Sequence, residues 1–352
     1  MKIKLAILDS DKSYLNRIVS VFTNSFADKI ELYSFSICDV ALQKIAENKV
    51  DVFLASDDFD INPDSIPQRC GFAYFVESAS IESVKGQRAI CKFQKSEMIY
   101  KEILGIFSEH TSGEIALAFD NDANTKLCTF VSASGGVGCS TVAAACAKHF
   151  AMSGKKVLYL NIEPFGNPDL FFSGSGQFDF SDVLFALKSK KSTFAYKLES
   201  YVKQDLSGVY FYSAAKNALD IKEMNAEDLK KLISDIRMSG NYEYIIIDAG
   251  FAVNDEIVEL MKMTTNLVFV SDGSEISNSK FERAYRVLEI IEQQYDFSVI
   301  SKTLLMYNKF SNKTSTALDF GIEVIGGQPR VENAHSYEIV EAMKKLDCFE
   351  KL

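Results

Sequence analysis

Short apolar runs alternate with amphipathic stretches through the first hundred residues. Runs with the length of buried strands lie at 4–9, 30–35, 50–56, 71–77 and 88–93. The segments between them carry apolar residues at helical spacing, as at Leu15, Ile18, Val19 and Phe22. Strands that alternate with helices form parallel sheets covered on both faces, so residues 1–108 are predicted to form one α/β domain.

The same alternation resumes after a polar segment. Residues 109–125 are acidic, contain glycine and have few apolar positions, so we interpret them as a linker between domains. Further apolar runs follow at 127–134, 156–162, 242–248 and 304–310. The fold class expected for the whole chain is therefore α/β, with two doubly wound parallel-sheet domains at 1–108 and 126–352.

Composition narrows the classes of function. The chain has 352 residues and a net charge of −10, which argues against a broad nucleic-acid-binding surface. No apolar run is long enough to span a bilayer, and the start has no signal-peptide pattern. The seven cysteines form no CxxC pair, as is usual for reduced thiols. We expect a cytoplasmic protein that does not insert stably in a membrane.

A glycine-rich segment separates the strand at 127–134 from a helix at 142–154. Its sequence, SGGVGCST at 134–141, has the glycines that let backbone N–H groups surround a phosphate, and the following helix N-terminus favours an anion. A simple glycine turn is the alternative. The residues expected to hold the nucleotide are Gly135, Gly136, Val137, Gly138, Cys139, Ser140 and Thr141.

Two acidic residues follow later strands of this domain. Asp248 ends the strand at 242–248, and Glu163 follows the strand at 156–162. In phosphate-loop proteins a loop hydroxyl binds Mg²⁺ and a strand-end acid holds the ion. We therefore expect Ser140 to bind Mg²⁺ directly, and Asp248 and Glu163 to hold it through water. Glu163 is also the candidate catalytic residue.

These segments resemble the MinD/ParA class of P-loop ATPases with a deviant Walker A motif. SGGVGCST is similar to that class's K-G-G-x-G-K-[ST], and NIEPFGN (161–167) is similar to its D-x-D-P-x-G-N. YIIIDAG, LLMYNKF and GGQPRVENA resemble its later segments. The resemblance implies ATP and Mg²⁺ as ligands and a homodimer formed through the second domain. It also implies that Asn308 meets adenine and that Pro329 and Arg330 line the base.

The sequence departs from this class at both lysines. Ser134 replaces the signature lysine, and Cys139 replaces the ordinary P-loop lysine. Losing one charge-assisted hydrogen bond costs about 10–150-fold in affinity. Losing a cation on a transferring phosphoryl group costs roughly 10³–10⁵ in rate. We therefore expect ATP binding with slow or absent hydrolysis. Cys139 at a helix N-terminus could be a nucleophile, but no partner base is evident.

The first domain resembles a response-regulator receiver, because an acidic LDSD follows its first strand. A receiver followed by a MinD-like ATPase is the arrangement of the TadZ/CpaE proteins of Tad (Flp) pilus assembly. Ser56 stands where the phosphoacceptor acid would end the third strand, with Asp57 and Asp58 out of register. Lys95 is either the usual receiver lysine or a surface lysine. We interpret the domain as a module that binds other pilus or secretion proteins.

The C-terminal segment 336–352 reads as an amphipathic helix. Its acids oppose anionic lipid, so packing on its own domain is favoured over membrane binding. The preferred function is an ATP-binding, dimerising scaffold for a Tad pilus or secretion machine, cytoplasmic and either polar or membrane-peripheral through partners. The alternatives are an active ParA/MinD-type ATPase that positions DNA or a division apparatus, and an interaction protein with a dead P-loop.

Overall fold

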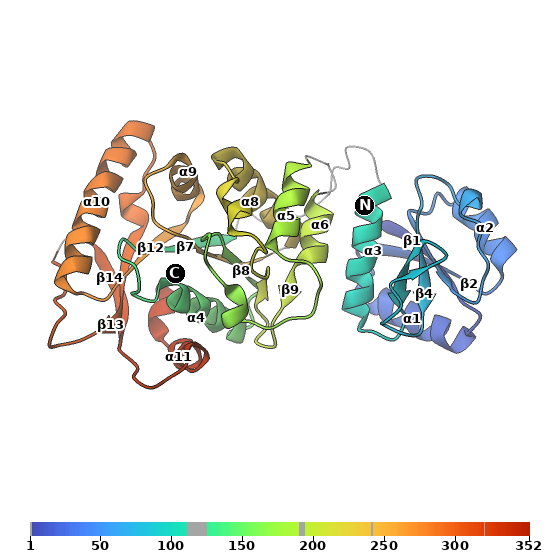
Figure 1. Cartoon of the computed structure of the whole chain (residues 1–352), viewed down its shortest axis with the longest axis horizontal. Coiled ribbons are helices and arrows are strands. Elements are labelled where there is room, and N and C mark those ends of the chain that lie inside the picture. Colours follow the sequence, from blue (N-terminus) through green and yellow to red (C-terminus); the bar gives the residue numbers. More distant parts are fainter. Residues whose placement is uncertain (1, 111–124, 190–193, 241, 320) are drawn as a thin grey trace. The chain divides into compact units, whose positions relative to one another are not determined.

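The computed structural model describes residues 2–110, 125–189, 194–240, 242–319 and 321–352. Their contacts divide the chain into two compact units, each built on one mainly parallel sheet (Figure 1). Of the described residues, the first unit holds 2–110 and 194–200, and the second holds the remainder. The expected linker at 109–125 lies outside the described residues, apart from its first two residues and its last.

The first unit has a six-stranded sheet in the order β2-β1-β3-β4-β6-β5. Its pairs are parallel except the short β5–β6 pair. The elements are β1 (Ile3–Leu8), α1 (Lys12–Ser25), β2 (Ile30–Phe35), α2 (Cys38–Glu47), β3 (Val52–Ser56), β4 (Gly71–Val76), β5 (Ser83–Val84), β6 (Gln87–Cys91) and α3 (Ser96–His110).

Both faces of this sheet are buried. Leu5 and Ile7 of β1 pack in one cluster with α1 and α3, while Ala6 and Leu8 pack in a second cluster with α2. Successive side chains of a strand point to opposite faces, so a continuous apolar run is stable only where helices cover both. The prediction of helices on both faces is confirmed.

A helix from much later in the chain completes this unit. Helix α6 (Phe194–Tyr201) places the ring of Tyr196 5.0 Å from that of Phe107 on α3. Glu199 accepts a 2.6 Å hydrogen bond from Lys29 Nζ in an ion pair. Tyr196 is 6% exposed and belongs to the same apolar cluster as α1 and α3. Residues 194–200, although they follow the phosphate loop in sequence, are therefore part of the receiver-like unit.

The second unit has an eight-stranded sheet in the order β14-β13-β12-β7-β11-β8-β10-β9, parallel except for β9. Its strands are β7 (Lys126–Val131), β8 (Val157–Asn161), β9 (Lys203–Gln204), β10 (Tyr210–Phe211), β11 (Tyr244–Asp248), β12 (Asn266–Ser271), β13 (Thr303–Phe310) and β14 (Glu323–Pro329). Its helices are α4 (Cys139–Met152), α5 (Phe180–Lys188), α7 (Ala218–Lys222), α8 (Ala226–Gly240), α9 (Asp255–Met263), α10 (Glu275–Tyr295) and α11 (Ser336–Met343).

The C-terminal segment packs on its own unit. Val340 and Met343 of α11, with Phe349 of the short 3₁₀ helix Asp347–Lys351, are fully buried in the cluster around α4. Lys148 of α4 is 2% exposed, and its ammonium lies 3.1 Å from Glu341 Oε1. The expected packing of the C-terminal helix is thus confirmed.

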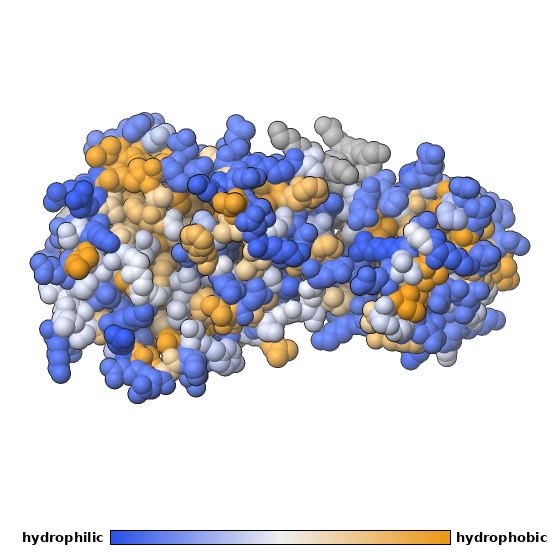
Figure 2. Space-filling model, viewed as in Figure 1, coloured by the Kyte–Doolittle hydropathy of each residue, from blue (hydrophilic) through white to orange (hydrophobic). Residues whose placement is uncertain are grey.

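The face drawn in Figure 2 is largely hydrophilic, and its apolar residues gather in several patches. A few large apolar side chains are well exposed, among them Phe165 at 90% and Phe185 at 78%. Among the described residues, no helix has the length and apolar character needed to cross a bilayer.

Replacing a buried aromatic residue near the C-terminus tests the packing of this segment. Phe349→Ala should lower the free energy of unfolding of the second unit by about 3–5 kcal/mol, because it removes a fully buried ring. Phe185→Ala, the same change at an exposed position, should alter it by less than about 0.5 kcal/mol. Urea unfolding of the full chain measures both, and equal midpoints for the two variants would contradict the packing.

Candidate functional site

The centre of the second sheet brings the expected site residues to one edge. Strand β7 lies between β11 and β12, and β11 pairs in turn with β8. The parallel register places Asp248 beside Phe130 on one side and beside Asn161 on the other. Carboxyl ends of parallel strands share an edge, so Asp248, Asn161 and the loop after β7 converge there.

The loop after β7 has the backbone of an anion cradle. Gly136 and Gly138 have φ values of 80° and 86°, in the left-handed region that favours glycine. Gly138 is the N-cap of α4, so the first N–H groups of the helix follow it directly. A Cβ on Gly138 would lie 2.5 Å from Asn308 Nδ2, which excludes other residues unless Asn308 moves.

The loop borders an open cleft of about 330 Å³. Its lining unites the predicted phosphate-loop and magnesium residues: Ser132, Ser134, Gly135, Gly136, Val137, Gly138, Cys139, Ser140, Thr141, Glu163, Asp248, Ala249 and Gly250. Ser132, Ser134, Ala249 and Gly250 line the cleft without having been among the residues expected to hold nucleotide or Mg²⁺. Ser132 shapes the start of the loop, because its hydroxyl donates to Ser134 O and accepts from Ser134 N.

The carboxylate of Asp248 is the buried charge of this cleft. Its Oδ2 accepts hydrogen bonds from Tyr159 Oη at 2.8 Å and Asn161 Nδ2 at 2.7 Å, and the side chain of Ser140 also lowers its pKa. Asp248 is 1% exposed, and burial raises its pKa to about 6 despite these donors. A buried carboxylate without a cationic partner attracts a metal ion.

The oxygen ligands of this edge fit Mg²⁺ held jointly with phosphate. Among the described residues, no group of three or more His, Cys, Asp or Glu side chains is arranged to hold a metal ion. Mg²⁺ usually takes one or two carboxylates and completes its shell with water and substrate phosphates. Ser140 and Asp248 supply this kind of partial site, with Glu163 on the same cleft.

Asn161 makes a structural contact that its family counterpart, an acid, could not make with an ionised Asp248. Its amide donates to Asp248, and its side chain also fills the space above Gly166, where a Cβ would lie 2.1 Å from Asn161 Oδ1. The turn from Glu163 to Gly166 is closed by the hydrogen bond from Gly166 N to Glu163 O. The glycine of NIEPFGN is therefore needed for close approach to Asn161.

Cys139 lacks the properties of a reactive thiol. Burial raises its pKa well above the usual value, and the carboxylates of Asp248 and Glu163 raise it further. The thiolate is the nucleophilic form, so this thiol is protonated at neutral pH and the nucleophile hypothesis loses its basis. Its position at a helix N-terminus does not outweigh the two nearby acids.

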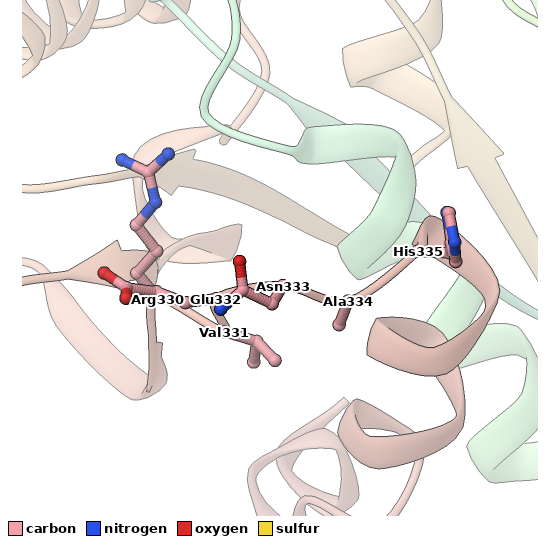
Figure 3. A pocket seen from close by; sticks show the side chains of 6 residues that line it. All are labelled: Arg330, Val331, Glu332, Asn333, Ala334 and His335. Carbon is pink, nitrogen blue, oxygen red and sulfur yellow. The ribbon is translucent and has the colours of Figure 1, made fainter.

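The residues expected at the base lie on neighbouring strands beside the loop. Asn308 is 3% exposed, and its amide donates to Val137 O at 2.8 Å. Asn308 of β13 pairs in register with Gln328 of β14, and Phe310 pairs with Pro329. Pro329 therefore lies on the strand next to Asn308. Arg330 begins a segment that borders a second open cavity of about 590 Å³, with His335 at the other end of the segment in Figure 3. The structure thus brings Asn308 to the loop and places Pro329 and Arg330 on the adjoining strand end.

The strand ends of the first unit carry a different polar cluster. Ser56 is fully buried at the end of β3, and its hydroxyl donates to Asp58 Oδ2. Ser10 Oγ donates to the same oxygen, so the side chain of Asp58 returns to the end of β3 although the sequence places it out of register with the strand. Asp57 is exposed.

A buried ion pair lies at the strand ends where a receiver has its phosphorylation site. Lys92, 7% exposed, places its ammonium 3.6 Å from Oδ2 of the fully buried Asp9. Lys95 is exposed, so the structure favours its reading as a surface lysine. Sequence reasoning missed Lys92, although its place directly after the last parallel strand was the available signal.

Comparison with protein families assigns both units. A model described as the TadZ-like receiver domain matches residues 1–108, and a model of an AAA domain matches residues 125–299. The chain is a TadZ-like receiver domain joined to a ParA/MinD-like AAA domain. The resemblance found in the sequence is thereby confirmed for both domains.

Solved structures agree with the fold of the AAA domain. The MinC:MinD cell division protein complex of Aquifex aeolicus matches with a TM-score of 0.51 and 18% identity, covering 64% of this chain and 95% of that one. MinD of Pyrococcus horikoshii, complexed with Mg-ADP, matches with a TM-score of 0.50 and 16% identity, covering 64% and 92%. At these identities the likeness shows the fold. No curated protein matched the sequence.

The raised pKa of Asp248 predicts a pH-dependent stability of the AAA domain. The folded pKa of about 6 exceeds the ordinary 3.8, so stability falls as pH rises through this window. Without Mg²⁺ or nucleotide, the wild type should gain about 1.4 kcal/mol over Asp248→Asn between about pH 7.5 and pH 5. Thermal unfolding of both proteins measures the gap, and a gap that stays constant with pH would contradict the burial of an ionisable carboxylate.

Proposed function

We propose that this chain is an ATP-binding, dimerising scaffold that helps to position a Tad (Flp) pilus or related secretion machine, with slow or absent ATP hydrolysis. The TadZ-like receiver domain supports the pilus context, and the ParA/MinD-like AAA domain supports nucleotide binding. The observation that carries the proposal is the buried Asp248 carboxylate, which borders the same cleft as Ser140 and the glycine loop.

The AAA domain has the groups needed to bind Mg-ATP. Gly136 and Gly138 allow successive backbone N–H groups to face the phosphates, and the N-terminus of α4 adds a partial positive charge. Ser140 would bind Mg²⁺ directly, while Asp248 and Glu163 would hold its water ligands. Bound Mg²⁺ would neutralise phosphate charge and would stabilise the ionised form of the buried Asp248 carboxylate.

The phosphate loop lacks the cationic side chains that would speed ATP hydrolysis. Ser134 and Cys139 occupy the two lysine positions of the related motif, and neither carries a cation. Glu163 remains the candidate catalytic carboxylate on the cleft. A lysine on the transferring phosphoryl group contacts charge that develops in the transition state, so it contributes mainly to the rate of hydrolysis. Its absence should therefore reduce the hydrolysis rate more than the affinity for ATP.

Exposed apolar residues near the cleft support a dimer formed through this domain. Phe165 follows β8 and is 90% exposed, and Val253 follows β11 and is 66% exposed. Both loops leave the sheet edge that carries the phosphate loop. A second copy that covered these side chains would remove apolar surface from water without needing the cross-dimer lysine absent at Ser134.

The receiver domain would act through its surface. Its phosphoacceptor position is Ser56, and Lys92 is paired with Asp9 in the interior. A serine cannot form the acyl phosphate of a receiver, so this domain would bind pilus or secretion proteins without a phosphorelay.

Calorimetry with Mg-ATP tests the nucleotide site. The folded wild type should bind, and Gly138→Ala should abolish binding, because it forces a side chain into a left-handed conformation and displaces Asn308. Gly105→Ala, the same change in α3 of the receiver domain, meets only ordinary contacts and should leave binding unchanged. Absence of binding by the wild type at millimolar ATP would favour the interaction protein with a dead loop.

Sedimentation of the full chain tests the dimer. Mg-ATP should produce a dimer that persists, and Phe165→Ser should weaken it, whereas Phe185→Ser on α5 should not. A nucleotide-dependent dimer requires the dimer to bind ATP more tightly than the monomer does. A monomer with and without Mg-ATP would contradict dimerisation. A dimer that decays within minutes while ADP accumulates would favour a working ParA/MinD-type ATPase.

A further inference from the structure

The end of strand β13 has an irregular backbone beside the phosphate loop. The register between β13 and β14 shifts between Asn308 and Phe310, so Lys309 is the extra residue of a β-bulge. Lys309 has a φ of 59°, in the left-handed region. Residues other than glycine rarely have a positive φ. This backbone strain persists only where the surrounding structure holds the residue in place.

The bulge directs two consecutive side chains to the same loop. Asn308 Nδ2 donates to Val137 O at 2.8 Å, and Lys309 Nζ donates to Gly136 O at 2.7 Å. In a regular strand consecutive side chains point to opposite faces. The bulge and the positive φ of Lys309 therefore place its ammonium group on the phosphate loop.

This ammonium group lies on a loop whose own motif has no lysine. Ser134 and Cys139 leave the motif without a lysine of its own. Lys309 reaches the loop from a strand more than a hundred residues later, and its Cε lies 3.5 Å from the position of a Cβ on Gly138. An ammonium group has three donors, so the bond to Gly136 O leaves two for another acceptor. Lys309 is exposed to solvent, which leaves these donors accessible to a ligand.

We propose that Lys309 is a phosphate-binding residue that supplies from β13 the positive charge missing at Ser134 and Cys139. The inference rests on the proposed ATP site and adds a residue that the motif does not include. The bond to Gly136 O fixes the ammonium at the loop before the nucleotide arrives. The remaining donors then meet oxygens of the polyphosphate, and the charge attracts Mg-ATP more strongly than a neutral side chain would.

The competing interpretation is that Lys309 only braces the loop. A brace depends on the hydrogen bond to Gly136 O, whereas a phosphate ligand depends on the charge as well. Charge interactions at an exposed site weaken as salt increases, and a packing or bracing role does not. The salt dependence of ATP affinity therefore separates the two roles.

The experiment compares Lys309→Met, Lys309→Arg and Lys302→Met in the full chain. Lys302, directly before β13 at its opposite end, is the matched control for losing one positive charge. Calorimetry with Mg-ATP at low and high ionic strength gives the affinities. At low salt Lys309→Met should bind about 10–150-fold more weakly than wild type, and Lys302→Met should bind as wild type does. Lys309→Arg should restore most of the loss, and Lys309→Met should show the shallower salt dependence.

Two results would overturn the assignment. Equal affinity of Lys309→Met and Lys302→Met would remove Lys309 from the site. A loss of affinity with an unchanged salt dependence would assign Lys309 the bracing role alone. Binding by the wild type is measured in the same series, so a wild type that does not bind Mg-ATP defeats the proposed function, whereas a bound wild type with an unaffected Lys309→Met defeats only this inference.

Discussion

The carboxylate of Asp248 organises the AAA domain because it is ionisable, buried and held by neutral donors only. Tyr159 and Asn161 come from β8, the strand beside β11, and Ser140 comes from the first turn of α4. One side chain thus links two strands and the helix that follows the phosphate loop. Its burial destabilises the charged form, so a cation bound at this sheet edge would stabilise it. The glycines of the loop and the turn at Gly166 are consistent with this arrangement.

Much of this architecture could be predicted from two features: apolar runs mark the strands, and the carboxyl ends of parallel strands meet at one edge of the sheet. The apolar runs that contain β7, β8, β11 and β13 fix the strands, and parallel pairing then requires their carboxyl ends to meet. The glycines at 135, 136 and 138 identify the loop, since few other segments need consecutive residues of such freedom. The acid at Asp248 follows from its place at a strand end. None of these inferences needed knowledge of a side-chain conformation.

The residues that sequence reasoning missed depend on backbone irregularity or on long-range packing. Lys309 lies within a predicted strand, at 304–310, but the bulge that turns it toward the loop cannot be seen in the hydrophobic pattern. Lys92 is buried, whereas the charge of a lysine alone would assign it to the surface. Asp58 returns to Ser56 through a turn whose geometry no periodicity encodes. In each case the side chain is positioned by a neighbour distant in sequence.

Helix α6 has a consequence for how the protein is made. The receiver-like unit is discontinuous in the chain, since its apolar cluster includes Tyr196 against Phe107 of α3. On a translating ribosome, residues 2–110 emerge long before α6 does, and the surface of α3 at Phe107 stays uncovered while the phosphate loop and β8 are synthesised. Domains generally begin to fold in the order of synthesis. Residues 2–110 therefore cannot complete the packing of the first unit when they emerge, and that packing waits for a helix encoded inside the span of the neighbouring unit.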